Sequence, residues 1–183
     1  MSNPVRPDEY EYYLPLVGDS MFEFGGKVNG ELGTYKAWFE GLGFRHVSVD
    51  FDPRWSDHIR DLRVPQWPEF GQFGMVCDIG TAEHVDGQHG LWENVHHLTK
   101  VGGVYVGQHP APNSDSWWWH GMHYPTEEFY EQFADVNGWE IERMGRGLKA
   151  PNENLYVRMR RVTKMDFTMP DESLIYFNRM RAR

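Results

Sequence analysis

Hydrophobic residues along this chain follow two spacings, one typical of strands and the other typical of helices. Short apolar or alternating runs at Ser20–Phe24, at residues 44–51 and from Phe73 onward predict strands. Between the first two runs, apolar side chains recur with the period of one helix face, at Leu32, Tyr35, Phe39 and Leu42. The alternation of strands and helices predicts an α/β fold built on a mostly parallel sheet.

The stretch from Phe73 to Pro110 is the clearest unit of this kind. Its strand is followed by a helix, ended by Gly102 and Gly103, and Val104 begins a further strand. The apolar positions of that helix are Leu91, Trp92, Val95 and Leu98. Strand, helix and strand in this order predict neighbouring parallel strands, whose ligands bind at the carboxyl ends.

The second half of the chain predicts one more helix and a hairpin. Thr126 is suited to cap a helix that Asn137 and Gly138 would end, with Phe129, Tyr130, Phe133 and Val136 as its buried face. Residues 139–144 and 155–162 alternate as two antiparallel strands. The proline-containing segment 53–72 is irregular, with a short helix over residues 56–62 capped by Ser56.

Composition favours a single globular domain over residues 1–183, with an N-terminal arm at 1–19 and a basic C-terminal extension at 163–183. Residues 1–13 lack the apolar core of a signal peptide, and no apolar run reaches the length of a membrane span. Cys77 is the one cysteine, which excludes an internal disulfide and favours a reducing, cytoplasmic setting.

Net charge argues against broad nucleic-acid binding. The chain carries a formal charge of −9, and phosphate backbones bind positively charged surfaces. Residues 158–183 hold seven basic and three acidic side chains, a net charge of +4, so the remainder carries −13. We interpret this basic end as a solvated face or as a tail paired with the acidic body, with a partner contact as the alternative.

The turn Glu83-His84-Val85, followed by a helix and the Gly102-Gly103 turn, resembles the middle of class I S-adenosylmethionine-dependent methyltransferases. The resemblance extends over the order of elements from residue 20 to residue 162. It implies a Rossmann-like three-layer α/β sandwich, with a mostly parallel sheet and a C-terminal antiparallel hairpin. It also implies S-adenosyl-L-methionine as the cofactor.

A glycine turn follows the first predicted strand. Glycines there let a ligand approach the backbone closely, and the following helix offers free N–H groups. The family reads acidic-x-Gly-x-Gly-x-Gly at this place. Here Glu23 and Gly25 match, whereas the later glycine spacing departs. The turn predicts cofactor contacts at Glu23, Gly25, Gly26 and Lys27.

Asp50 ends the second predicted strand, 25 residues after Gly25, where an acidic side chain is suited to accept hydrogen bonds from ribose hydroxyls. Asp52 competes for this role. The resemblance further implies that Phe51 packs on the adenine, that Asp61 and Leu62 contact it, and that the methionine part lies against Asp78, Ile79 and Gly80.

Histidines are the conspicuous polar feature of the chain. His84 and His109 follow consecutive strands, so both should face the ligand crevice, and either is suited to accept a proton from an acceptor hydroxyl. His96 and His97 fall on the polar side of their helix and should be solvated. His120 and His123 lie on a loop above the crevice. Histidines also bind zinc, but no spacing such as His-Glu-x-x-His occurs, so no metal is predicted.

These observations favour methyl transfer from S-adenosylmethionine to a small-molecule or saccharide acceptor. Two alternatives stay open: a binding or assembly protein with a decayed cofactor site, and a nicotinamide-dependent oxidoreductase. Trp117-Trp118-Trp119 would form either a lid over the acceptor or a contact in a homo-oligomer. The sequence contains no phosphate-binding loop of the Gly-x-x-x-x-Gly-Lys type and no Gly-x-Ser-x-Gly nucleophile turn.

Overall fold

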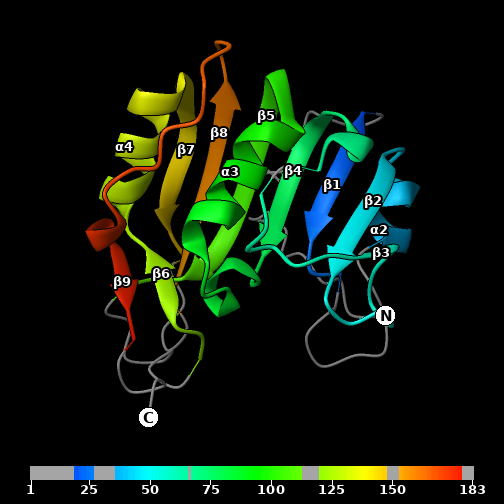
Figure 1. Ribbon diagram of the computed structural model, residues 1–183, viewed down its shortest axis with the longest axis horizontal. Helices are drawn as coiled ribbons and strands as arrows, with labels where there is room; N and C mark the ends of the chain where they lie inside the picture. Colours follow the sequence, from blue (N-terminus) through cyan, green and yellow to red (C-terminus); the bar gives the residue numbers. More distant parts are fainter. Residues whose placement is uncertain (1–18, 27–35, 66, 113–119, 148–152, 179–183) are drawn as a thin grey trace.

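The computed structural model describes residues 19–26, 36–65, 67–112, 120–147 and 153–178 (Figure 1). A seven-stranded sheet runs through them in the order β3-β2-β1-β4-β5-β8-β7. The first five strands in this order are parallel, whereas β8 runs antiparallel to both of its neighbours. The bounds are β1 Ser20–Phe24, β2 Arg45–Asp50, β3 His58–Ile59, β4 Phe73–Ile79, β5 Thr99–Pro110, β7 Trp139–Arg146 and β8 Asn154–Arg161.

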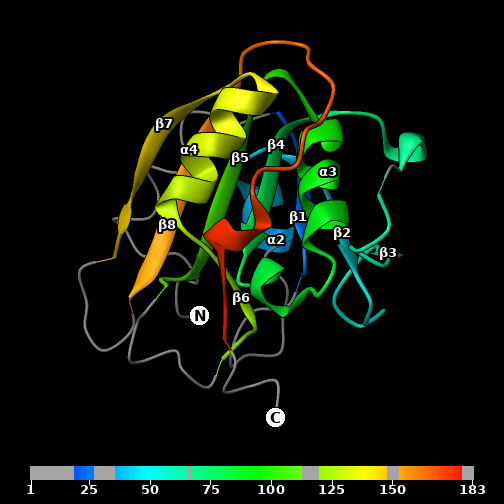
Figure 2. The ribbon, with the colours of Figure 1, turned by 60° about the vertical axis from the view of Figure 1, so that its left-hand side comes forward.

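Helices cover both faces of the sheet. Helices α3 (Gln88–Leu98) and α4 (Glu127–Asn137) lie on one face, and α2 (Lys36–Gly41) lies on the other (Figure 2). Two separate apolar clusters match these layers, one containing Trp92 of α3 and the other containing Phe39 of α2. Side chains of a strand alternate between the two faces, so Val76 of β4 joins the first cluster and Met75 the second. The predicted three-layer Rossmann-like fold is therefore confirmed.

Smaller elements complete the described part of the chain. A two-stranded antiparallel sheet joins β6 (His123–Pro125) to β9 (Ile175–Phe177). Three short 3-10 helices are η1 (Pro68–Phe70), η2 (Ala82–His84) and η3 (Glu172–Leu174). None of the described helices combines the length and the hydropathy that a bilayer crossing requires.

Helix α4 begins and ends where the sequence predicts. The Thr126 side chain accepts a hydrogen bond from the Phe129 N–H, which satisfies one of the free donors of the first turn. Gly138 has a left-handed conformation with φ 69°, and its N–H donates to the carbonyl of Ala134. These local signals explain why the prediction for this helix is correct.

Three local predictions are wrong. Gly102 and Gly103 do not end α3, which stops at Leu98; both glycines lie within β5, where the pairing with β4 shifts register. The short helix expected over residues 56–62 is absent, and His58–Ile59 instead forms strand β3, parallel to β2. His96 is fully buried rather than solvated, because Met165 and Phe167, from the segment that follows β8, contact its ring. Its ring hydrogen-bonds with the Met165 carbonyl and accepts from Trp139 Nε1, and burial lowers its pKa to about 4.

Part of the basic end that begins at residue 158 belongs to strand β8 of the main sheet. The Arg161 guanidinium is buried and donates to the carbonyls of His96 and Thr99. Arg158 and Arg160 both pair with Glu142. The excess positive charge is therefore paired in part with the acidic body, as the first interpretation expects.

Candidate functional site

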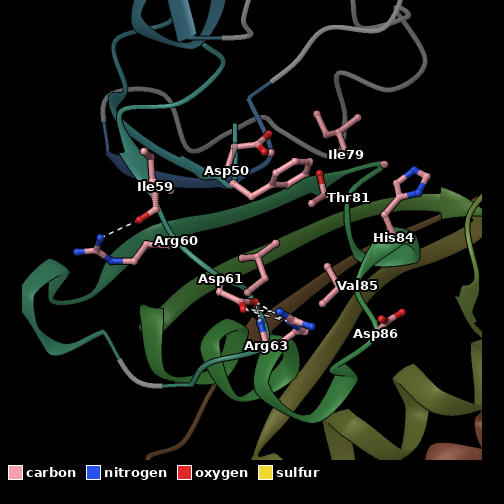
Figure 3. Close-up of a pocket in the computed structure, with 14 residues that line it drawn as sticks. Asp50, Ile59, Arg60, Asp61, Arg63, Ile79, Thr81, His84, Val85 and Asp86 are labelled. Atoms are coloured by element: carbon pink, nitrogen blue, oxygen red, sulfur yellow. Dashed lines mark hydrogen bonds and ion pairs between the residues drawn. The ribbon is translucent and has the colours of Figure 1, made fainter. Parts of the chain in front are cut away.

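A pocket of about 660 Å³ opens at the carboxyl ends of β1, β2 and β4 (Figure 3). The strand order runs outward in opposite directions from the β1–β4 boundary, so the pocket lies at the topological switch point of the sheet. At a switch point the loops that follow two adjacent strands go to opposite faces of the sheet. The space between these loops makes room for a ligand. The lining consists of Gly25, Asp50, Phe51, Ile59, Arg60, Asp61, Leu62, Arg63, Ile79, Gly80, Thr81, His84, Val85 and Asp86.

Most of the residues predicted to bind the cofactor meet at this pocket. They come from four segments that are far apart in the sequence, and they are Gly25, Asp50, Phe51, Asp61, Leu62, Ile79 and Gly80. The predicted base His84 lines it as well. Predicted residues that do not line it are Glu23, Gly26, Asp78 and His109. Lys27 and the three tryptophans at 117–119 lie outside the described residues.

The glycine turn after β1 passes close to the loop that follows β4. Gly25 has φ +70°, and a Cβ added there would lie 2.1 Å from Thr81 Oγ1. Thr81 Oγ1 donates to the Phe24 carbonyl, which ties the two loops together. A side chain at residue 25 would therefore both strain the backbone and push the Thr81 loop away from the pocket.

Asp50 and Phe51 combine a polar and an apolar feature at one edge of the pocket. One carboxylate oxygen of Asp50, Oδ1, accepts from the Asp52 N–H, and Oδ2 has no hydrogen bond within the described part of the chain. The Phe51 side chain is 85% exposed, and Ile59 across the edge is 57% exposed. Large apolar side chains at the rim of a polar-lined hollow are suited to hold a flat aromatic ring between them.

Asp61 lines the pocket but is already paired. Its two carboxylate oxygens accept from Arg63, at 3.0 Å from Nε to Oδ1 and 2.8 Å from Nη2 to Oδ2. This pairing lowers the pKa of Asp61. Because Arg63 occupies both oxygens, an adenine amino group would have to share or displace this ion pair. The predicted contact with Leu62, whose side chain is buried beneath, needs no such exchange.

Glu23 lies under the pocket rather than in it, contrary to the prediction. Its side chain is fully buried, and Oε2 lies 2.8 Å from Nε2 of His46 on the neighbouring strand β2. Burial raises the pKa of Glu23, and the bond to His46 opposes that shift. The acidic residue of the turn therefore holds β1 to β2, and any effect on a ligand is through the position of the turn.

The two candidate bases differ in position. His84 lies in the loop after β4, where its side chain is 43% exposed at the pocket. His109 is buried in the apolar core with its ring stacked on Tyr130, and its Nε2 hydrogen-bonds with the Tyr130 hydroxyl. Burial lowers the pKa of His109 to about 4. The expectation that both histidines face the crevice therefore holds only for His84.

Asp78 shapes the pocket from below. Its Oδ1 accepts from the N–H groups of Thr81 and Ala82, at 3.0 and 3.2 Å, and so fixes the loop that lines the pocket. Burial, with the negative charge of Glu83 as a second cause, raises the pKa of Asp78 to about 8. His109 Nδ1 lies 3.8 Å from Asp78 Oδ2, on the side of Asp78 away from the loop.

We expect wild type to lose stability as the pH rises from 6.5 to 8, and we expect Asp78→Asn to abolish this loss. The folded protein holds the Asp78 proton up to about pH 8, whereas the unfolded chain releases it near 3.8, so stability falls by about 1.4 kcal/mol per pH unit between these values. His109 opposes this slope only below 6.5, its ordinary pKa. Wild type should therefore lose about 2 kcal/mol from pH 6.5 to 8.

Urea denaturation at these two pH values measures the difference. Asparagine keeps an acceptor for the two backbone N–H groups and carries no titrating proton, so the variant should show a flatter dependence on pH. An equal decline in wild type and variant would assign the titration to another group.

Sequence reasoning missed several residues that line the pocket, namely Ile59, Arg60, Arg63, Thr81, Val85 and Asp86. Thr81, Val85 and Asp86 could have been found, because they lie in the loop after β4 that the resemblance already singles out. Ile59 and Arg60 lie in the segment for which the sequence predicts a helix, and Arg63 directly follows it; their position follows from the pairing of β3 with β2.

Comparison with solved structures places the fold among class I methyltransferases. A 1,6-didemethyltoxoflavin N1-methyltransferase from Burkholderia thailandensis, crystallised with its substrate and S-adenosylhomocysteine, superposes with a TM-score of 0.64 at 16% identity, covering 87% of this chain and 79% of that one. An S-adenosylmethionine-dependent methyltransferase from Mesorhizobium loti gives a TM-score of 0.62 at 16% identity, covering 81% and 94%.

A third similar structure is geranyl diphosphate C-methyltransferase from Streptomyces coelicolor, in complex with Mg²⁺, geranyl diphosphate and S-adenosylhomocysteine. Its TM-score is 0.58 at 13% identity, covering 79% of this chain and 74% of that one. No protein-family model matches the sequence, and no curated protein matches it. At these identities the likeness establishes the fold that the sequence resemblance predicts.

Proposed function

We propose that this protein is an S-adenosylmethionine-dependent methyltransferase. The observation that carries the proposal is the meeting of Gly25, Asp50 and Phe51 at the switch point of a methyltransferase fold. These three residues are the ones that the sequence assigns to close backbone approach, ribose hydroxyls and adenine. Solved structures with this fold are described as S-adenosylmethionine-dependent or contain S-adenosylhomocysteine, which supports the choice of cofactor.

The pocket has two ends that suit the two ends of this cofactor. Ile59 and Asp50 lie at one side of the pocket, and His84 lies at the other (Figure 3). The adenosine would lie against Phe51, Ile59 and Leu62, with its ribose hydroxyls donating to Asp50. The methionine part would extend past Gly80 toward His84. When bound, the cofactor supplies an electrophilic methyl group at that second end.

The chain's own residues position the reacting groups. The cofactor could approach the protein backbone closely at Gly25, at Gly80 and at the loop that Asp78 fixes. His84 lies where it could accept the proton of an acceptor hydroxyl. We propose a small-molecule or saccharide acceptor. Two of the similar structures are methyltransferases of unrelated small molecules, 1,6-didemethyltoxoflavin and geranyl diphosphate, so they do not select one acceptor.

Calorimetric titration with S-adenosylhomocysteine and, separately, with NAD⁺ tests the proposal. We expect saturable one-to-one binding of S-adenosylhomocysteine and none of NAD⁺. Binding of NAD⁺ alone would favour the oxidoreductase, and binding of neither ligand to the folded protein would favour a binding or assembly protein.

We expect Phe51→Ala to weaken S-adenosylhomocysteine binding up to about tenfold, because one face of the adenine loses a stacked ring. Phe177→Ala is the matched control, since Phe177 is also exposed, at 43%, but belongs to β9 and does not line the pocket. The same calorimetric titration measures both variants. Equal affinities in both variants would place the adenine elsewhere.

A further inference from the structure

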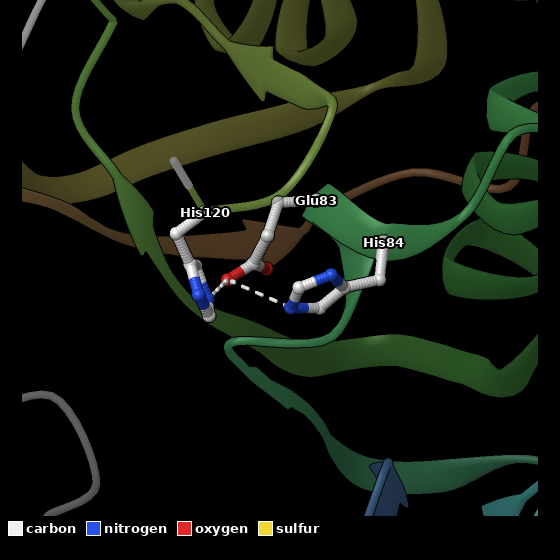
Figure 4. A group of neighbouring side chains, drawn as sticks. All are labelled: Glu83, His84 and His120. Atoms are coloured by element: carbon white, nitrogen blue, oxygen red, sulfur yellow. Dashed lines mark ion pairs between the residues drawn. The ribbon is translucent and has the colours of Figure 1, made fainter. Parts of the chain in front are cut away.

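A second group of polar side chains lies beside the pocket, around the carboxylate of Glu83 (Figure 4). Glu83 and His84 belong to η2, and His120 comes from the segment that leads into β6. The distance from Oε1 of Glu83 is 3.3 Å to Nε2 of His120 and 3.9 Å to Nε2 of His84. One ligand atom from each residue lies within 4.8 Å of the others.

Backbone contacts fix the two segments of this group to each other. The Met122 N–H donates to the Glu83 carbonyl at 2.7 Å. Gly121 has φ +66°, and a Cβ added there would lie 2.7 Å from Cγ of Glu83, so the chain at 121 packs directly on the Glu83 side chain. This close packing brings His120 to the carboxylate although the two residues are far apart in the sequence.

Glu83 is a buried carboxylate whose hydrogen-bonding capacity is not filled. Its residue exposure is 1%, and Oε2 has no hydrogen-bond partner among the described residues. A buried ionised carboxylate needs a cation or several donors to offset its desolvation. Imidazole nitrogens of His84 and His120 converge on its other oxygen, Oε1, and neutral imidazoles are themselves metal ligands.

We propose that Glu83, His84 and His120 bind a divalent transition metal such as Zn²⁺, Co²⁺ or Mn²⁺. Metal bonds of about 2.0 to 2.2 Å place neighbouring ligand atoms about 3 to 3.4 Å apart, which matches Glu83 and His120 and requires a small rotation of His84. Two imidazoles and one carboxylate favour this class over Mg²⁺ and Ca²⁺, which prefer all-oxygen sites. Three protein ligands leave further positions open.

His84 also lines the pocket, so a metal held by this group would lie at the edge of the pocket, within reach of an acceptor bound there. This part of the inference rests on the proposed methyltransferase function and names its acceptor as an oxygen nucleophile. An acceptor hydroxyl bound to the metal releases its proton to solvent, and its oxygen attacks the methyl carbon. The carbon–sulfur bond breaks, and its electron pair stays on sulfur to give S-adenosylhomocysteine. The metal then replaces His84 as the group that activates the hydroxyl.

Titration of the untagged full-length chain with Co²⁺, followed by visible absorption and by displacement with Zn²⁺, tests the site without any cofactor present. We expect one tight site per chain, and at least about hundredfold weaker binding in His84→Ala and in His120→Ala, since loss of supporting groups alone costs ten- to hundredfold. His97→Ala is the matched control, because His97 also lies near a glutamate, 3.5 Å from Glu93, on the exposed surface of α3. Its Co²⁺ affinity should equal that of wild type.

Wild-type affinity for Co²⁺ no higher than that of His120→Ala would overturn the proposal, as would equal weakening in His97→Ala. Circular dichroism checks that each variant folds. Glu83→Gln keeps the size of the side chain and should also lose affinity for Co²⁺, which is a third independent test. Titration with S-adenosylhomocysteine separates this proposal from the proposed function. His120→Ala should bind S-adenosylhomocysteine as tightly as wild type while it loses its affinity for Co²⁺. If the proposed function is wrong, wild type itself should not bind S-adenosylhomocysteine.

Discussion

Trp92→Ala is expected to destabilise the protein by about 3 to 5 kcal/mol, which approaches the whole stability of many domains of this size. Trp92 is fully buried on α3 and is the centre of the larger apolar cluster. Its ring centroid lies 4.8 Å from that of Phe129, and 5.6 to 5.7 Å from those of Tyr105, Tyr130 and Phe133. Alanine would leave a cavity bordered by α3, α4 and β5. The surrounding aromatic rings would shift to fill only part of it.

A hydrogen bond is lost in the same substitution. Trp92 Nε1 donates to Gln88 Oε1 at 2.9 Å, and the amide of Gln88 donates in turn to the carbonyls of Ala82 and Val85. The substitution therefore leaves a buried acceptor unpaired next to η2, at the side of the pocket. We expect a loosened η2 as well as a less stable core.

Urea denaturation at constant pH measures this effect as a shift of the transition midpoint at unchanged slope. Val101→Ala is the control, because Val101 is 47% exposed near the start of β5 and should change stability by about 0.5 kcal/mol or less. A Trp92→Ala midpoint close to that of Val101→Ala would show that the core does not depend on the α3–α4 contact.

The sequence predicts the elements whose signals are local. The strand from Phe73 and the α3 helix with its Leu91 and Trp92 positions are present, because each depends on neighbouring residues alone. The predicted cap at Gly102 is absent, since α3 ends at Leu98 and Gly102 lies inside β5. The fate of His96 could not be read in this way. It lies on a helix face that is polar by sequence, and it is buried by residues that follow β8. Only the folded chain shows which segment covers that face.

The candidate site divides along the same line. Asp50 and Gly80 follow the rule that parallel strands bind ligands at their carboxyl ends, so sequence order is enough to place them. His84 and His109 satisfy that rule equally, yet the His109 side chain points into the core. His109 is a residue of β5, so its side chain follows the alternation of that strand onto the face of Tyr105, which α3 and α4 cover. The position of His84 depends instead on the loop that the hydrogen bonds of Asp78 fix, which no spacing in the sequence reveals.

Asp50→Ala is expected to weaken S-adenosylhomocysteine binding by about 100-fold, measured by calorimetric titration. A charged acceptor contributes about 1.5 kcal/mol or more to each hydrogen bond that it accepts, so losing two ribose hydroxyls costs about 3 kcal/mol, which corresponds to that factor. Asp50→Asn keeps one acceptor oxygen without the charge, and its affinity should lie between those of wild type and Asp50→Ala. This graded series would assign the effect to the hydroxyl contacts.

Asp52 provides the matched control, two residues further along the same turn. Its carboxylate accepts from Arg54 Nε at 2.9 Å and does not line the pocket, so Asp52→Ala should bind S-adenosylhomocysteine as tightly as wild type. The reverse outcome, with Asp52→Ala weakened and Asp50→Ala unchanged, would move the ribose to the outer side of the turn. The cofactor would then not extend from Asp50 toward His84, and the acceptor end of the pocket would have to be sought elsewhere.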